Sequence, residues 1–156
     1  EPHIDLQLLL YPVTDADLTR ASYLENGKGY LLERDTMQWF WDTYCPDPAQ
    51  RLDPRASPIR ATNLANLPPA RVVTAEFDPL RDEGEAYAAR LLAAGVPTTV
   101  TRYDGQIHGF YTNDAIMREH PPESASAEAA LIGQDPGTVK AEEPAEPEQP
   151  KPDQAA

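Results

Sequence analysis

The sequence has few of the features that would direct it to nucleic acid or to a membrane. It holds 13 lysines and arginines against 26 acidic residues, and no basic cluster that could neutralise a row of phosphates. No apolar run approaches the ~18–20 residues that span a bilayer. No basic start followed by an apolar stretch and a small-residue cleavage site is present either. We therefore expect no nucleic-acid partner, no membrane span and no signal peptide.

Cysteine is nearly absent. Cys45 stands alone, which excludes a disulfide within the chain and fits a reducing, cytoplasmic compartment. No histidine lies near it in the sequence, so we interpret it as a buried or incidental thiol rather than a nucleophile.

The acidic excess is concentrated near the C-terminal end of the sequence. Residues 119–156 contain nine acidic residues against two lysines, together with seven of the 17 prolines. We expect residues 140–156 to form a disordered acidic, proline-rich tail. Residues 119–139 are poorly defined, with one short helix expected at 126–133. The remaining segment, 1–118, has the composition of an ordinary folded domain.

Three short apolar runs predict β-strands. Residues 4–11, "IDLQLLLY", suit a strand buried on both faces of a parallel sheet. Residues 70–77 have the same character, and the β-branched run 97–104 ends in the turn pair Asp104-Gly105. A helix between the last two runs completes a β–α–β unit. The fold class we expect is α/β, with a parallel sheet.

Two amphipathic helices are expected between these strands. Asp82 is the predicted N-cap of the helix after the second strand, with Glu85 in the capping-box position and Gly95 as its stop signal. Another helix lies in the long connection 13–69, where Asp35 is the predicted cap. Its apolar stripe indicates core packing, with a substrate cleft as the alternative. The stripe consists of Met37, Phe40, Trp41 and Tyr44.

Two candidate catalytic residues follow the strands. Asp78 comes directly after strand 70–77, and His108 follows strand 97–104 by a short turn. Because the carboxyl ends of parallel strands meet at one edge of a sheet, we expect these side chains to meet there. A carboxylate can orient an imidazole that takes a proton from a nucleophile. Each residue also has an ordinary interpretation, since Asp-Pro starts turns and a lone histidine is usually structural.

A longer stretch carries a family resemblance. From about residue 3 to residue 111, and above all in "DPLRDEG…AGVP…YDG…HGF", the sequence resembles the C-terminal half of the hormone-sensitive-lipase family of α/β-hydrolases, a group of bacterial esterases and lipases. The resemblance implies that Asp78 is the triad acid and His108 the triad base. It implies that Asp82 and Glu83 are helix-start residues. It implies no cofactor, no metal, and a small acyl ester as the substrate of the complete enzyme.

Other motifs of this family are missing from the sequence. Neither the G-x-S-x-G nucleophile segment nor an HGGG-type oxyanion loop occurs, and no serine has flanking glycines at that spacing. We therefore expect the C-terminal part of an α/β-hydrolase fold, with three parallel strands and helices, whose missing motifs precede residue 1. Such a carboxylic-ester hydrolase fragment would be inactive alone. The serines present are Ser22, Ser57, Ser124 and Ser126.

Two other interpretations stay open. One is a non-enzymatic remnant or a binding module whose acidic tail faces a partner. An in-frame "GDSAGG"-like segment within about eighty residues upstream in the coding sequence would support the enzyme, and a genuine start at residue 1 would support the remnant. The other is a dienelactone-hydrolase-like or peptidase relative with the same fold, against which "DPLRDEG" argues.

The tail gives a testable prediction. Deletion of residues 136–156 should leave the melting temperature nearly unchanged, because a segment so acidic and so poor in apolar residues has no core to lose. Differential scanning calorimetry of the full and shortened chains measures this. A fall of more than a few degrees would mean that the tail packs on the domain.

Overall fold

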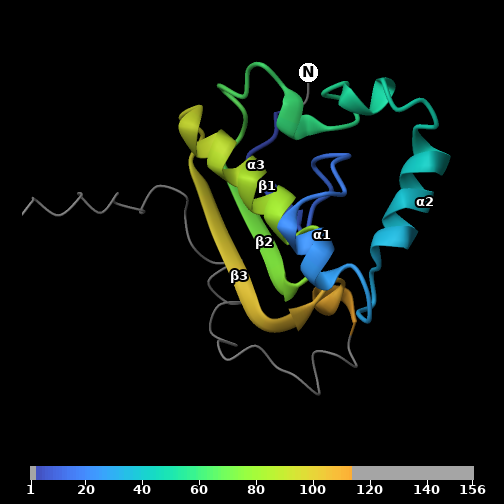
Figure 1. The fold of residues 1–156 in the computed structure, drawn as a ribbon. Coiled ribbons are helices and arrows are strands. Elements are labelled where there is room, and N and C mark those ends of the chain that lie inside the picture. Colours follow the sequence, from blue (N-terminus) through green and yellow to red (C-terminus); the bar gives the residue numbers. More distant parts are fainter. Residues whose placement is uncertain (1–2, 114–156) are drawn as a thin grey trace, which may run out of the picture.

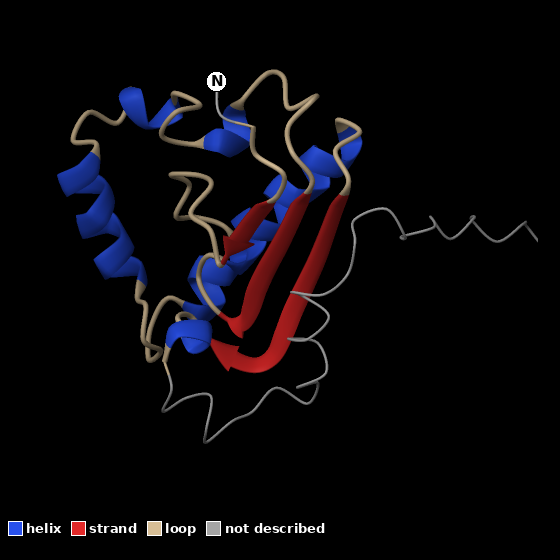
Figure 2. Ribbon diagram, turned by 180° about the vertical axis from the view of Figure 1, so that it is seen from behind, coloured by secondary structure: helices blue, strands red, loops and turns tan. Residues whose placement is uncertain are grey.

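A three-stranded parallel sheet organises the computed structural model, which describes residues 3–113. Strands β1 (Gln7–Leu10), β2 (Ala70–Phe77) and β3 (Thr98–Ile107) lie side by side in that order. Helix α3 (Arg81–Ala93) lies across one face of the sheet (Figure 1), and Figure 2 shows the opposite face. The α/β class and the parallel sheet are confirmed. The segments predicted at 119–139 and 140–156 lie outside the described residues.

Strand β1 is shorter and more exposed than the sequence suggests. The expected strand 4–11 reduces to Gln7–Leu10, and Leu8 keeps 51 % of its surface exposed. Ile4 and Leu6 are exposed as well. Within the described residues β1 pairs only with β2, so its other edge has no neighbouring strand. The expectation of burial on both faces is therefore wrong in the described part of the chain.

Strand β3 is longer than expected. It runs through Asp104-Gly105, which the sequence suggested as a terminating turn, and ends at Ile107. The turn-forming pair instead lies in an irregularity of the β2–β3 register, where Gly105 adopts a φ of +74°. Its N–H donates a hydrogen bond to Oε2 of Glu76 at 2.7 Å. A local bulge therefore uses the glycine without ending the strand.

Helix α3 forms where the sequence predicts a helix, but without the predicted cap. Leu80 occupies the N-cap position without a side-chain cap hydrogen bond, and Asp82 lies in the first turn. Glu85 hydrogen-bonds to the sheet side chain Thr74 rather than back to the helix start. The predicted stop is confirmed, since Gly95 follows the helix with a φ of +81°. Because Asp-Pro already forms the turn that starts α3, the capping box is not needed.

The connection between β1 and β2 carries the remaining helices. Helix α2 begins at Arg34 with Glu33 as its N-cap, so the predicted Asp35 cap is wrong by two positions. Figure 1 shows α2 standing apart from the sheet, on the far side of α1. The elements of this connection are α1 (Ala21–Asn26), α2 (Arg34–Tyr44) and the 3₁₀ turns η1 (Gln50–Leu52) and η2 (Pro58–Arg60). A last 3₁₀ turn, η3 (Phe110–Thr112), follows β3.

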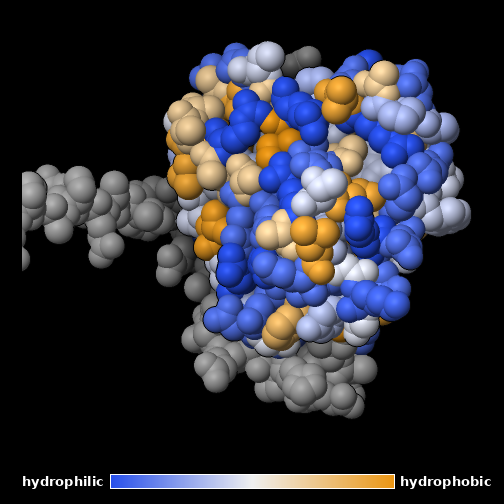
Figure 3. Space-filling view, in the orientation of Figure 1, coloured by the Kyte–Doolittle hydropathy of each residue, from blue (hydrophilic) through white to orange (hydrophobic). Residues whose placement is uncertain are grey.

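Apolar packing forms separate clusters on the two faces of the sheet. One lies between α3 and the sheet and includes the buried residues Tyr87 and Leu91. On the other face, β2 and β3 pack against Phe110 of η3. On the outer side of α3, hydrophobic atoms form small patches among hydrophilic ones (Figure 3). Between residues 3 and 113 no helix is both long and apolar enough to cross a bilayer.

The open edge of β1 gives the second prediction. We expect the isolated chain to self-associate through this edge, because unpaired backbone groups beside exposed leucines favour pairing with another strand. Leu8→Glu should shift the sedimentation profile towards monomer, since a charged side chain disfavours edge-to-edge pairing. Leu92→Glu on α3 is the matched control, because Leu8 and Leu92 are both 51 % exposed. Equal association of both variants and the parent chain would contradict this assignment of the edge.

Candidate active site

The site begins at Asp78, the first residue after β2. Its side chain is completely buried. One carboxylate oxygen, Oδ1, accepts a hydrogen bond from the N–H of Leu80 at 2.8 Å, and this contact forms the turn into α3. Asp78 therefore fulfils the ordinary role of an Asp-Pro turn residue with one oxygen, and Oδ2 is available for another partner.

That partner is His108. Its Nδ1 lies 2.8 Å from Oδ2 of Asp78, although the two residues are thirty positions apart. The strand register explains why the two side chains are adjacent. Phe77 and Ile107 are partners across β2 and β3, and Asp78 and His108 are the residues that directly follow them. Gly109, with a φ of +80°, lets the chain turn away directly after the imidazole.

The hydrogen bond fixes the tautomer of the ring. An ionised carboxylate only accepts hydrogen bonds, so the proton belongs on Nδ1 of His108 and Nε2 is left as the acceptor. The imidazole is 22 % exposed, whereas its carboxylate partner is fully buried. The exposed part of the pair is thus the ring, as a proton-accepting group requires.

Tyr11 is a site residue that the sequence analysis missed. The centroid of its ring lies 4.6 Å from that of His108, with the two planes tilted by 59°. Its backbone φ of +36° is unusual for a residue with a side chain, and its N–H donates to the carbonyl of Val73 at 2.7 Å. The sequence holds only a weak signal for this, an aromatic residue before Pro12 where a strand ends.

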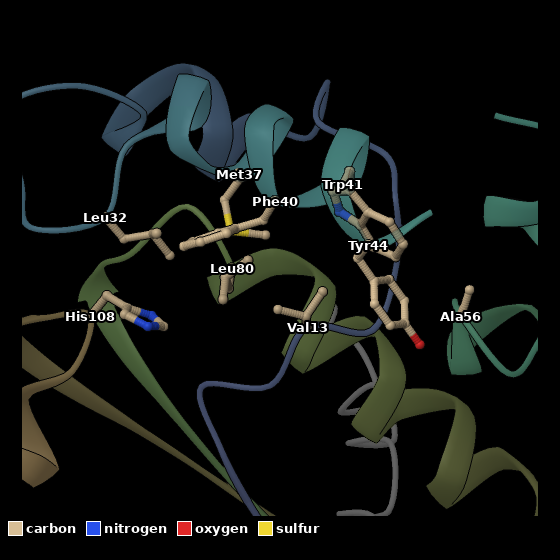
Figure 4. Close-up of a pocket in the computed structure, with 9 residues that line it drawn as sticks. All are labelled: Val13, Leu32, Met37, Phe40, Trp41, Tyr44, Ala56, Leu80 and His108. Atoms are coloured by element: carbon tan, nitrogen blue, oxygen red, sulfur yellow. The ribbon is translucent and has the colours of Figure 1, made fainter. Parts of the chain in front are cut away.

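An apolar cavity of about 410 Å³ opens beside the imidazole. Figure 4 shows residues of α2 forming one wall, with Val13 and Leu80 opposite and the His108 ring at one end. All four residues of the predicted apolar stripe line this cavity. Met37 and Trp41 are also buried in the core, so the core-packing interpretation is confirmed for these two, and the substrate-cleft interpretation stays a prediction. The lining is Val13, Leu32, Met37, Phe40, Trp41, Tyr44, Ala56, Leu80 and His108.

The two serines of the described residues are engaged elsewhere. Oγ of Ser22 donates to the carbonyl of Pro79, and Oγ of Ser57 donates to that of Arg51, each at 2.6 Å. Both side chains are fully buried. Residues 3–113 thus bring together an acid, a base and a cavity, and neither of their serine hydroxyls bonds to His108.

The matching family model is described as an α/β-hydrolase fold and covers residues 1–112. The chain belongs to this family. The resemblance to its hormone-sensitive-lipase group is thereby confirmed.

Individual relatives are esterases. The chain is 45 % identical over 114 residues to an ethyl acetate hydrolase of Pseudomonas putida, with 73 % of this chain and 36 % of that protein covered. An arylesterase of Saccharolobus solfataricus is 40 % identical over 114 residues, covering 72 % and 37 %. A thermostable esterase structure from Pseudomonas putida superposes with a TM-score of 0.74 at 46 % identity, covering 84 % and 40 %. The chain thus spans about a third of the length of these curated relatives.

A buried carboxyl group lies close to the site. Glu83 was expected to be only a helix-start residue, but its side chain is fully buried in α3. Its Oε1 accepts hydrogen bonds from the N–H groups of Thr14 at 2.7 Å and Asp15 at 3.2 Å. The pKa of the Glu83 carboxyl is raised to about 7, mainly by burial and also by the nearby Asp15 carboxylate, while these hydrogen bonds act to lower it.

Glu83 gives the third prediction. Its folded pKa lies above the ordinary 4.5, so its contribution to stability is complete below about pH 4.5 and is lost as the pH rises to about 7. The difference between the ordinary and the folded pKa corresponds to about 3 kcal/mol in the free energy of unfolding. Glu83→Gln, which stays neutral, should therefore gain stability relative to the parent chain across this window, as measured by urea unfolding.

Glu85→Gln is the control for this experiment. Burial acts to raise the pKa of Glu85, but hydrogen bonds from Arg102 and Thr74 outweigh it and lower the pKa. The stability that Glu85 contributes is therefore lost as the pH falls, the opposite trend. If the free energies of unfolding of Glu83→Gln and the parent chain differ by the same amount at every pH, the ionisation assigned to Glu83 is contradicted.

Proposed function

We propose that this chain supplies the general base and the orienting acid of a carboxylic-ester hydrolase. The observation that carries the proposal is the 2.8 Å contact between Nδ1 of His108 and the buried Asp78 carboxylate, at the end of an apolar cavity. The nucleophilic serine and the oxyanion donors would come from a segment outside this sequence. The esterase relatives support the reaction class, and the family relationship supports the serine mechanism.

The reaction would proceed in two halves. In the first, Nε2 of His108 accepts the proton of the serine hydroxyl as its oxygen bonds to the ester carbonyl carbon. The same imidazolium then gives that proton to the leaving alcohol as the carbon–oxygen ester bond breaks. In the second half, water replaces the serine by the reverse sequence and releases the acid. Asp78 keeps the ring in the correct tautomer and stabilises the imidazolium in both halves.

The cavity beside His108 would receive the apolar part of the ester. Its lining is almost entirely hydrocarbon and aromatic, contributed by α2 and by the segments around it. A pocket of this kind binds by excluding water from apolar surface rather than by hydrogen bonding. Uncharged esters with small apolar groups are therefore the proposed substrates, and neither a cofactor nor a metal takes part in the proposed chemistry.

The fourth prediction tests the two catalytic assignments. The chain is fused behind the N-terminal part of an esterase of the same family, chosen because it carries a G-x-S-x-G motif and so supplies the serine. This fused enzyme should hydrolyse short-chain p-nitrophenyl esters. Asp78→Asn and His108→Ala should each lower kcat by roughly 10³ or more, as losses within a triad do. The isolated chain should hydrolyse them no faster than free imidazole.

Two substitutions serve as matched controls. His3→Ala removes an imidazole whose side chain is 85 % exposed, and Asp104→Asn removes an exposed carboxylate of β3. Both should leave kcat within about twofold, since surface changes away from a site have small effects. If Asp78→Asn or His108→Ala behaves like these controls at equal stability, the assigned role of that residue is wrong. Saturable turnover by the isolated chain would show that it contains its own nucleophile.

A further inference from the structure

The segment from Tyr11 to Asp15 connects β1 to the active site. At its start, the Tyr11 ring lies against the His108 imidazole, and two residues later Val13 contributes to the cavity wall. The positive φ of Tyr11 costs of order 1–3 kcal/mol, so contacts with the surrounding structure must stabilise this conformation.

The first turn of α3 provides contacts that stabilise the Tyr11–Asp15 segment, through both the side chain and the backbone of Glu83. Oε1 of Glu83 accepts the N–H groups of Thr14 and Asp15, and Oγ1 of Thr14 donates to the carbonyl oxygen of Glu83 at 2.8 Å. The next residue, Gly84, allows the close approach. A Cβ there would lie 3.2 Å from Cγ2 of Thr74 and 3.4 Å from Cδ of Pro12. The segment is therefore fastened to α3 by hydrogen bonds and by tight packing.

The Glu83 carboxyl group is completely buried, next to a second buried polar side chain. Oε2 of Glu83 and the hydroxyl of Tyr23 are both buried away from solvent. Burial raises the pKa of Tyr23, and the charge of the Glu83 carboxyl and a side-chain hydrogen bond to it raise that pKa further, so the two groups lie close together. A carboxyl group in this position costs stability when it ionises.

We propose that Glu83 is a positioning residue for the Asp78–His108 pair, acting through the Tyr11–Asp15 segment. By holding Thr14 and Asp15, it places the Tyr11 ring against one face of the imidazole. Asp78 fixes the edge of the ring through Nδ1, and Tyr11 limits its tilt, so that Nε2 keeps one direction. This inference rests on the proposed ester-hydrolase function for its catalytic meaning, but the contact itself can be tested without activity.

The test compares the accessibility of His108 in variants of the complete 156-residue chain. Diethyl pyrocarbonate modifies accessible imidazoles, and peptide mass spectrometry reports each site separately. His3, whose side chain is 85 % exposed against 22 % for His108, is the internal reference. In the parent chain His108 should react more slowly than His3. Equal rates would show that the Tyr11 contact is not formed in solution and would overturn the proposal.

Glu83→Ala should raise the His108 rate roughly fivefold relative to His3, because the released segment opens locally. Tyr11→Leu should do the same by removing the ring itself. Glu83→Gln keeps the acceptor oxygen and should restore protection. Glu85→Ala is the structural control, since its partners Thr74 and Arg102 lie on the sheet. If Glu83→Ala leaves the His108 rate unchanged, or if Glu85→Ala at equal loss of stability raises it as much, the proposal fails.

A replacement variant and a kinetic measurement complete the test. If Glu83→Ala does not fold, Glu83→Asp replaces it; the carboxylate is retained but falls short of Thr14, and the same direction of change is expected. In the fused enzyme, Glu83→Ala should lower kcat about 10- to 100-fold with little change in KM, as small misplacements of a catalytic group do. The double variant Glu83→Ala with Tyr11→Leu should lose no more kcat than the more damaging of the two single variants.

These arms separate the two proposals. Additive losses in the double variant would mean that Glu83 does not act through Tyr11. A parent fused enzyme without esterase activity would refute the proposed function, whereas the modification rates of His108 would still decide whether Glu83 positions the ring.

Discussion

The site depends on an offset in the register between β2 and β3. Between the partner pairs Ala75–Tyr103 and Phe77–Ile107, β3 advances four residues while β2 advances two. An uninterrupted ladder would bring the residue two places before His108 beside the end of β2. The bulge thus decides which side chain meets the carboxylate. Because the offset is an even number of residues, the strand keeps its inward and outward faces on both sides of it.

Two polar contacts stabilise this arrangement from opposite sides of the strand ends. Within the sheet, the carboxylate of Glu76 accepts the N–H of Gly105 and satisfies a backbone group that the bulge leaves unpaired. Beyond the sheet, Asp78 is buried, and a buried carboxylate is tolerated only when its oxygens are hydrogen-bonded. Leu80 and His108 supply those bonds. The imidazole therefore contributes to the stability of the turn as well as to the proposed chemistry.

The sequence predicts the strand ends better than the details between them. Asp78 and His108 are predictable because a parallel β–α–β unit brings both strand ends to one edge, whatever the residues in the middle. The continuation of β3 through Asp104-Gly105 was not, since a turn pair and a bulge use the same glycine conformation. The contact of Tyr11 with the imidazole arises from segments nearly a hundred residues apart, and no local pattern encodes it.

Glu83 illustrates why local propensity misled at the start of α3. An acidic residue in the first turn is ordinarily a surface group favoured by the helix dipole, and Asp82 fits that description with its partial exposure. Glu83, one position further round the helix, faces inward, where ionisation is unfavourable and the pKa rises to about 7. An apolar residue there would avoid that cost but leave the N–H groups of Thr14 and Asp15 without their acceptor. The buried carboxyl is thus the compromise between a stable helix start and a loop held in place beside the imidazole.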